Sequence, residues 1–157
     1  MSSDTNPLDV VLGFVRTVEA GGGSADIEPF LTEDFTLTEW PHALSKNGST
    51  RTLQETLSGA DDSKSIVSDQ HFEVVRSTTE GNRVVLEMNW SATLLLDLPH
   101  WDAGERIRAR STAVFELRDG RIASQDTYDC YYTQPEQQRN AADEGQARPA
   151  RPVATAW

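Results

Sequence analysis

The residues best suited to chemistry lie near the end of the chain, where Asp126, Tyr128 and Asp129 occur within four positions. A carboxylate in an apolar surround can act as a general base and take a proton from a carbon next to a carbonyl group. A nearby tyrosine hydroxyl could donate a hydrogen bond to the oxyanion that this step creates. We interpret Asp126 as the base, Tyr128 as the donor and Asp129 as a substrate contact. The alternative for Asp126 is a structural carboxylate paired with an arginine of the neighbouring strand.

The alternation of side chains along the last strand decides which of these groups is buried. Ile122 sets the inward face, and Asp126 shares its parity, so this carboxylate is predicted to lie on the apolar side of the sheet. A buried carboxylate is costly unless it is paired or protonated, which makes Asp126 unusual. A β-bulge would shift the phase and put Thr127 or Asp129 inside instead.

A second group of candidates, Glu39, Trp40 and His42, surrounds Pro41 at the end of an earlier strand. His42 could move protons or bind a polar ligand, and Glu39 and Trp40 could orient it. The alternative for His42 is a surface-loop histidine, and the alternative for Glu39 is an exposed strand carboxylate. Other residues on the inward faces of the middle strands are predicted to line the pocket wall: Met88, Trp90, Ser111 and Phe115.

No motif indicates a metal or a cofactor. The three histidines, His42, His71 and His100, lack ligand spacings such as His-x-His or His-Glu-x-x-His. The glycines at 21–23 follow no strand and precede no Lys-Ser/Thr pair, so they do not form a phosphate loop. We therefore expect no metal and no cofactor.

Residues 100–101, in a long loop, could form a lid over the opening or an ordinary surface loop.

The elements that must position these residues are predicted from their periodicity. Apolar residues from Leu8 to Val18 recur at three- and four-residue spacing, which predicts a helix capped by Asn6. Short helices are predicted over residues 25–31 and over residues 50–57, the latter capped by Ser49 or Thr50. A short strand is predicted over residues 35–40.

Four longer strands follow, because alternation of period two extends over residues 70–78, 83–96, 105–118 and 121–132. Gly81-Asn82 and Asp119-Gly120 predict tight hairpin turns between them. Helices followed by an antiparallel meander indicate the α+β class. We predict one domain over residues 1–133 and an extended or disordered tail over residues 134–157, which is rich in Gln, Ala, Pro and Arg.

Composition limits the partners and the compartment. The 157 residues hold 14 Lys and Arg against 25 Asp and Glu, a net charge of −11 that would repel phosphate backbones and anionic membranes. We therefore predict no nucleic acid and no membrane partner. One cysteine and the absence of a signal-like N-terminus predict a reducing, cytoplasmic setting.

The segment from Ala113 to Ile122 with Asp126-Thr127-Tyr128-Asp129 resembles the last hairpin of the SnoaL-like branch of the nuclear transport factor 2-like superfamily. Residues 39–42, with Gly48 and Arg51, are similar to the segment that rims the cavity in those proteins. The resemblance extends from Pro7 to Tyr132. It implies a conical barrel in which a curved, mostly antiparallel sheet wraps around three N-terminal helices and leaves a pocket at the wide end.

The resemblance also implies a range of activities. Members include polyketide cyclases, ketosteroid isomerases, limonene epoxide hydrolases and dehydratases, together with binding modules without catalysis. In the cyclases and epoxide hydrolases a carboxylate on the last strands acts as general base, and Asp126 stands at the similar position. No tyrosine near the first helix matches the oxyanion donor of ketosteroid isomerases. The resemblance further implies a homodimer formed through the outer sheet face.

These observations together predict a small, cofactor-independent enzyme of the isomerase, cyclase or hydratase type. Its substrate would be a small hydrophobic carbonyl or polyketide-like metabolite held in an internal pocket. Asp126 would abstract or relay a proton, while Tyr128, His42 and Glu39 orient the substrate. The alternatives are a non-catalytic module that binds a similar ligand and a dimeric interaction protein that uses only its sheet surface.

Overall fold

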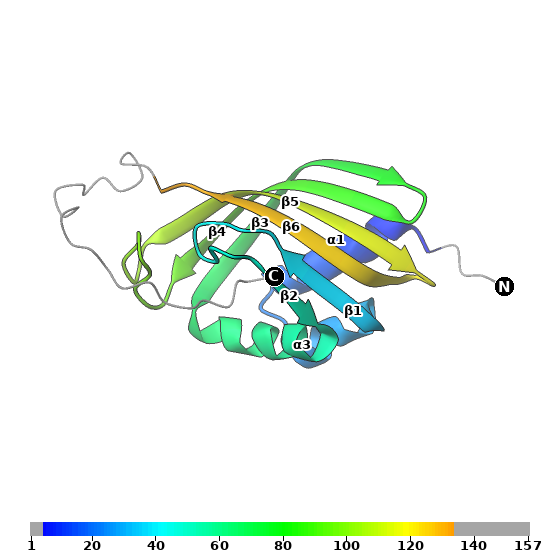
Figure 1. Ribbon diagram of the computed structural model, residues 1–157, viewed down its shortest axis with the longest axis horizontal. Coiled ribbons are helices and arrows are strands. Elements are labelled where there is room, and N and C mark those ends of the chain that lie inside the picture. Colours follow the sequence, from blue (N-terminus) through cyan, green and yellow to red (C-terminus); the bar gives the residue numbers. More distant parts are fainter. Residues whose placement is uncertain (1–4, 134–157) are drawn as a thin grey trace.

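A computed structural model describes residues 5–133 of the chain, and within them one curved sheet carries the helices on its concave side (Figure 1). The strand order is β2-β1-β6-β5-β4-β3, and every neighbouring pair is antiparallel except β1 and β6. Among the described residues the edge strands β2 and β3 do not pair, so the sheet stays open. The α+β class, with three helices and a curved, mostly antiparallel sheet, is confirmed.

The described chain begins with a helix and ends in four long strands. The helices are α1 (Pro7–Glu19), α2 (Ser24–Ile27) and α3 (Leu53–Asp62), with 3-10 turns at Glu28–Phe30 and Ser63–Ser65. The strands are β1 (Leu31–Glu39), β2 (Ser49–Thr52), β3 (Val67–Glu80), β4 (Arg83–Leu94), β5 (Arg106–Arg118) and β6 (Arg121–Tyr131). None of these helices has the length and apolarity needed to cross a membrane. The predicted tail, residues 134–157, lies outside the described residues, and the domain boundary at residue 133 stays a prediction.

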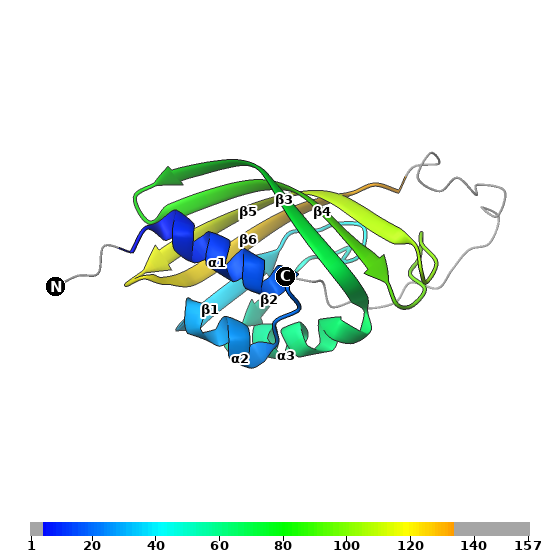
Figure 2. The same ribbon diagram turned by 180° about the vertical axis from the view of Figure 1, so that it is seen from behind.

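Helix α1 forms where its sequence predicts and lies across the concave face of the sheet (Figure 2). The Asn6 side chain accepts a hydrogen bond from the Leu8 amide at 2.9 Å, and Pro7 occupies the first turn, where its missing N–H costs nothing. Its apolar stripe is fully buried: Val11, Phe14, Val15 and Val18. This stripe forms the roof over the middle strands and closes that side of the core.

The segment predicted as a helix over residues 50–57 divides into a strand and a helix, so the predicted start and cap were wrong. Residues 49–52 pair with β1, and α3 begins only at Leu53. Thr52 is the cap, because its hydroxyl accepts from the Glu55 amide at 3.3 Å while Glu55 accepts from the Thr52 amide at 3.0 Å. This reciprocal pair outweighs the capping power of Ser49 or Thr50. As a result β2 carries Arg51 on the concave face.

We expect Thr52→Ala to lower the free energy of unfolding by about 1 kcal/mol, because the α3 amides lose their capping oxygen. The matched control is Thr50→Ala, which removes the same side chain from an exposed position of β2. Urea unfolding of both variants checks the assignment. Equal losses at the two positions would contradict a cap at Thr52.

A β-bulge in β6 changes the side-chain phase on which the sequence interpretation depended. Across the β5–β6 pair Leu117 lies opposite Ile122 but Glu116 lies opposite Ser124, so β6 carries one extra residue at Ala123. Beyond it Gln125, Thr127 and Asp129 face inward and are buried, while alternate residues face outward. The expectation that Asp126 and Tyr128 lie on the inner face was wrong, and the bulge is the reason.

Candidate functional site

Polar side chains of β1, β2, β5 and β6 meet on the concave face of the sheet. Glu39 pairs with Ser49 on one side and with Thr127 on the other, and Ser111 lies opposite Asp129. We call this group the inner polar cluster: Glu39, His42, Ser49, Arg51, Ser111, Gln125, Thr127, Asp129 and Tyr131. Most of these polar side chains are shielded from solvent, in a concave face that is otherwise apolar.

Glu39 is the centre of a charged arrangement within the cluster. It is 1% exposed, and its two oxygens lie 3.2 Å from Nε2 of His42 and 3.4 Å from Nη2 of Arg51. A buried carboxylate needs such partners, because burial removes its hydration. The sequence placed Glu39 among exposed or pocket-rim positions, whereas the structure buries it.

His42 uses both ring nitrogens. Nδ1 accepts a hydrogen bond from the Leu44 amide at 3.1 Å, and Nε2 faces Glu39. An Nδ1 acceptor places the ring proton on Nε2, which can then donate to the carboxylate. The side chain is fully buried. This arrangement fits a residue that positions Glu39 better than one that moves protons.

Asp129 and Tyr131 form the other half of the cluster. The Ser111 hydroxyl donates to Oδ1 of Asp129 at 2.5 Å across the β5–β6 pair. The Tyr131 ring lies two residues further along the same face, with ring centroids 5.3 Å from His42 and 6.1 Å from Trp90. Burial, followed by the negative charges of Asp129 and Glu39, raises the pKa of Tyr131 well above its usual value. Tyr131 therefore remains a protonated phenol, able to donate a hydrogen bond at neutral pH.

The pKa of Tyr131 predicts a loss of stability in alkaline solution. The folded protein keeps the phenolic proton, whereas the unfolded chain releases it near pH 10. The contribution of the Tyr131 phenol to the free energy of unfolding is therefore complete below pH 10 and falls as the pH rises above that value. We expect wild type to lose up to about 1.4 kcal/mol per pH unit more than Tyr131→Phe above pH 10. Urea unfolding at pH 9, 10 and 11 measures the difference. Parallel curves for the two proteins would contradict this environment for Tyr131.

Three of the predicted site residues lie together on the convex face. Trp40 is 46% exposed, Tyr128 is 45% exposed, and their rings stack at 6.0 Å. Nε1 of Trp40 donates to Oδ1 of Asp126 at 3.1 Å. Asp126 and Tyr128, the base and the donor predicted from the sequence, are thus neighbours on the convex side of the sheet, away from the inner polar cluster.

The other predicted site residues lie on the concave side. Glu39, His42, Ser111 and Asp129 belong to the inner polar cluster, and the wall residues are buried as expected: Met88, Trp90 and Phe115. Sequence reasoning missed Tyr131 and Gln125 as site residues. The signal for both was present, since they share the parity of Asp129, the carboxylate that a bulge would place inside.

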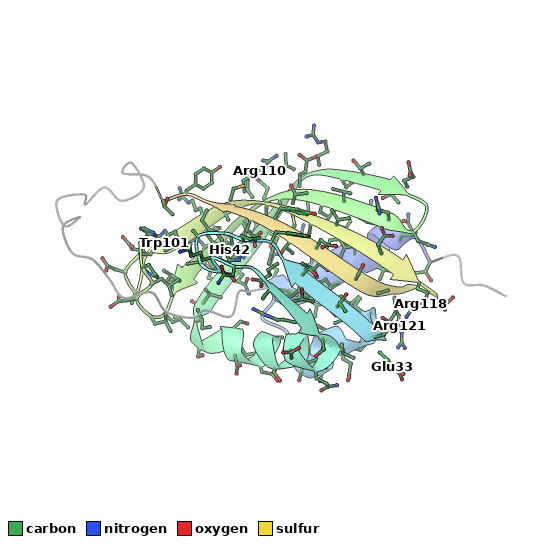
Figure 3. The ribbon with its side chains drawn as sticks, viewed as in Figure 1. Glu33, His42, Trp101, Arg110, Arg118 and Arg121 are labelled. Atoms are coloured by element: carbon green, nitrogen blue, oxygen red, sulfur yellow. The ribbon has the colours of Figure 1, made fainter. Side chains whose placement is uncertain are left out.

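The long loop between β4 and β5 also contributes to this end of the sheet. Trp101 is 4% exposed and packs on Tyr131 with ring centroids 6.0 Å apart. Figure 3 shows Trp101 and His42 at one end of the molecule and Arg118 and Arg121 at the other. Trp101 therefore covers the tyrosine instead of extending into solvent as a surface-loop residue would.

A cavity of about 230 Å³ lies between α1, α2, α3 and β3. Two contacts join its wall to the inner polar cluster. Phe14, in the wall, packs edge-on against Phe115, which lies opposite Gln125. Gln70, also in the wall, accepts a hydrogen bond from Nε1 of Trp90 at 3.0 Å, and Trp90 contacts Tyr131.

The acidic and histidine side chains are not arranged as a metal site. Within residues 5–133 no three His, Cys, Asp or Glu side chains come together in a way that could hold a metal ion. In the inner polar cluster the carboxylates instead face an arginine, a histidine and hydroxyl groups. The chemistry that this donor set supports is proton transfer and hydrogen bonding.

Comparison with known proteins agrees with this architecture. The family model described as a SnoaL-like domain matches residues 11–125. No curated protein matches the sequence.

Solved structures resemble the fold at low sequence identity. AclR from Streptomyces galilaeus, a candidate hydroxylase, is 14% identical with a TM-score of 0.66 and 87% of this chain and 85% of that chain covered. IdmH from Streptomyces antibioticus, a candidate polyketide cyclase, is 17% identical with a TM-score of 0.66 and coverage of 79% and 91%. A candidate polyketide cyclase from Acidithiobacillus ferrooxidans is 18% identical with a TM-score of 0.64 and coverage of 82% and 91%. At these identities the likeness concerns the fold.

Proposed function

The chain belongs to the SnoaL-like domain family, and from this premise we propose that it is a small enzyme for acid–base chemistry of the isomerase or cyclase type. The substrate that we propose is a hydrophobic carbonyl or polyketide-like compound. The observation that carries the proposal is that a buried carboxylate, Asp129, and a partly buried, protonated phenol, Tyr131, lie on one face of β6.

In the proposed reaction Asp129 takes a proton from the carbon next to a carbonyl group. Ser111 holds the carboxylate in place through the 2.5 Å hydrogen bond. Tyr131 donates to the carbonyl oxygen as it gains negative charge, which lowers the barrier most when the donor is fixed in advance. Residues two apart on one face of a strand lie about 6.5–7 Å apart along it, which leaves room for a carbonyl group between the two side chains.

The remaining charged residues have a positioning role in this proposal. Glu39 sits between His42 and Arg51, so its charge is balanced and its orientation is fixed. Asp129 accepts a hydrogen bond from the Ser111 hydroxyl, which fixes its orientation. In this proposal Asp129 is assigned to proton transfer and Glu39 to electrostatics, a division of roles that paired carboxylates take in known sites.

Two further observations support the substrate class. The cavity between the helices and β3 would hold the hydrophobic part of the compound, because its wall includes Phe14, Val18 and Ile27 and because Phe14 and Gln70 of this wall contact the side chains that pack beside the cluster. Two of the structural relatives are candidate polyketide cyclases.

Proton exchange at the carbon next to a ketone tests the proposed chemistry without the natural substrate. We expect wild type in D₂O to accelerate exchange at C2 of 1-tetralone, measured by mass spectrometry, by at least about 100-fold over buffer at pH 7. Binding of 1-tetralone is measured in parallel by ligand-observed NMR. Binding without acceleration would overturn the enzymatic proposal and favour the alternative, a non-catalytic module that binds small molecules.

A further inference from the structure

Four buried side-chain atoms of the inner polar cluster lack a hydrogen-bond partner among the described residues. They are Oγ of Ser49, Nη1 of Arg51, Nε2 of Gln125 and Oγ1 of Thr127. Gln125 is 1% exposed and Thr127 is 0% exposed. Buried polar groups are nearly always paired, because an unpaired one has lost its hydration without compensation. These atoms therefore require a partner that residues 5–133 do not supply.

The four atoms come from adjacent positions of the concave sheet. Arg51 and Gln125 lie on either side of Leu37 in one cross-strand row, and Ser49 and Thr127 lie on either side of Glu39 in the next. Neighbouring strands are about 4.8 Å apart, and a concave curve brings inward side chains closer still. The group thus faces a common region.

Helix α3 covers the Arg51 end of this group. A Cβ added to Gly59 would lie 3.2 Å from Nη1 of Arg51, so the glycine lets the helix approach the guanidinium. Ala60, the next residue of α3, lines the cavity of about 230 Å³. Nη1 of Arg51 therefore lies beside Gly59, the α3 residue that precedes a cavity-lining position.

All four groups can donate hydrogen bonds, and two of them, the guanidinium and the amide NH₂, can only donate at the atoms in question. Their complement is a ligand that offers acceptor oxygens. The charge of the cluster indicates whether this ligand is neutral or anionic. The carboxylates of Glu39 and Asp129 outnumber the single guanidinium of Arg51. An added anion would be repelled by this excess negative charge.

We propose that Arg51, Gln125 and Thr127, with Ser49 at the edge, form a recognition site for the carbonyl oxygens of a neutral, acceptor-rich ligand. This inference rests on the proposed function and deepens it. The four residues would bind carbonyl oxygens of the substrate at a distance from the reacting carbon.

Three bicyclic probes of nearly equal size test the ligand class by ligand-observed NMR with the full-length protein. Coumarin carries neutral acceptor oxygens, naphthalene carries none, and 2-naphthoate carries a negative charge. We expect coumarin to bind about tenfold more tightly than either of the others, as two gained hydrogen bonds imply. Absence of coumarin binding, or equal affinity for naphthalene, overturns the proposal, and a preference for 2-naphthoate replaces it with an anion site.

Variants of the donors separate recognition from structure. Thr127→Val and Gln125→Met keep side-chain volume but remove the donors, and each should weaken coumarin binding about threefold, the share of one of the two hydrogen bonds. Each should also raise the Tm of the ligand-free protein by about 2–4 °C, because an unpaired buried donor is removed. Thr112→Val, on the convex side of β5, is the matched control and should leave coumarin affinity unchanged.

The outcomes also distinguish this site from the proposed catalytic function, because neither binding nor Tm depends on turnover. Unchanged coumarin affinity in both variants overturns the proposal whatever happens to the Tm, and means that ordered water serves these atoms. Should Thr127→Val fail to fold, Thr127→Ser, which keeps the donor, must fold and bind coumarin with wild-type affinity. If wild type exchanges the protons of 1-tetralone while both variants bind coumarin with unchanged affinity, the enzymatic proposal stands and only the recognition site is excluded.

Discussion

Replacement of Asp129 by asparagine should reduce proton exchange of 1-tetralone by about 10²- to 10⁴-fold, the range that a positioned general base contributes. Asparagine has nearly the same shape and can still accept the hydrogen bond from Ser111, so the cluster keeps its geometry. It loses the ability to take a proton. Exchange is followed at pH 7 by mass spectrometry, and circular dichroism verifies that the variant is folded.

Asp126→Asn is the matched control, since it makes the same change three residues earlier in the same strand. Asp126 lies on the convex face, where it accepts from Nε1 of Trp40. We expect its exchange rate to stay within about twofold of wild type, because a convex carboxylate does not reach the proposed substrate. A large loss in Asp126→Asn with little change in Asp129→Asn would reverse the assignment and return the base to the position that the sequence suggested.

Arg51→Met should produce the largest loss of stability among single substitutions in the cluster, about 3–5 kcal/mol. The change removes the cation next to Glu39, whose carboxylate is 1% exposed and cannot be rehydrated without opening the core. Breaking one side of a buried ion pair costs more than the pair contributes, because the remaining charge is left uncompensated. Urea unfolding at pH 7 measures the loss.

The double variant Glu39→Gln with Arg51→Met should recover part of that stability, because it removes both charges. Arg118→Met is the surface control. Arg118 pairs with Asp34 where both side chains are more than half exposed, so its loss should be much smaller. A loss in Arg51→Met no larger than in Arg118→Met would contradict the burial of the Glu39–Arg51 pair.

Local signals in the sequence sufficed for most elements of the fold. Asp119 and Gly120 have φ angles of 51° and 78°, the left-handed pair that a two-residue hairpin turn requires. The cap at Asn6 and the four long strands likewise depend on neighbours in sequence, and the structure has them where the patterns predict. The class of fold follows from these local features and their order, whereas the family was suggested by the resemblance of the last hairpin and of residues 39–42.

The two errors both arose where contacts distant in sequence decide the structure. Residues 49–52 pair with β1, which a helix pattern read from residue 50 onward could not reveal. The bulge at Ala123 occurs where β6 pairs with β5 on one side and runs parallel to β1 on the other, and both pairings change register nearby. No residue in this stretch is a glycine or proline that would have marked the irregularity.

The consequence for the site was larger than for the fold. One extra residue exchanges the faces of every later side chain in the strand, so it replaced Asp126 and Tyr128 by Asp129 and Tyr131 on the concave side. The chemistry proposed, a carboxylate base with a tyrosine donor, is unchanged, whereas the residues that would perform it differ. Residue types suggested the chemistry that we propose, and the bulge determines which residues would perform it.

The inward orientation of Asp129 and Tyr131 is the claim on which the proposed function depends, and aromatic NOEs in the wild-type protein measure it directly. The structure predicts cross-peaks from the Tyr131 ring to the rings of Trp90 and Trp101, whose centroids lie 6.1 Å and 6.0 Å away, and from the Tyr128 ring to Trp40. Cross-peaks from Tyr128 to Trp90, with none from Tyr131, would show the opposite strand phase and contradict the account.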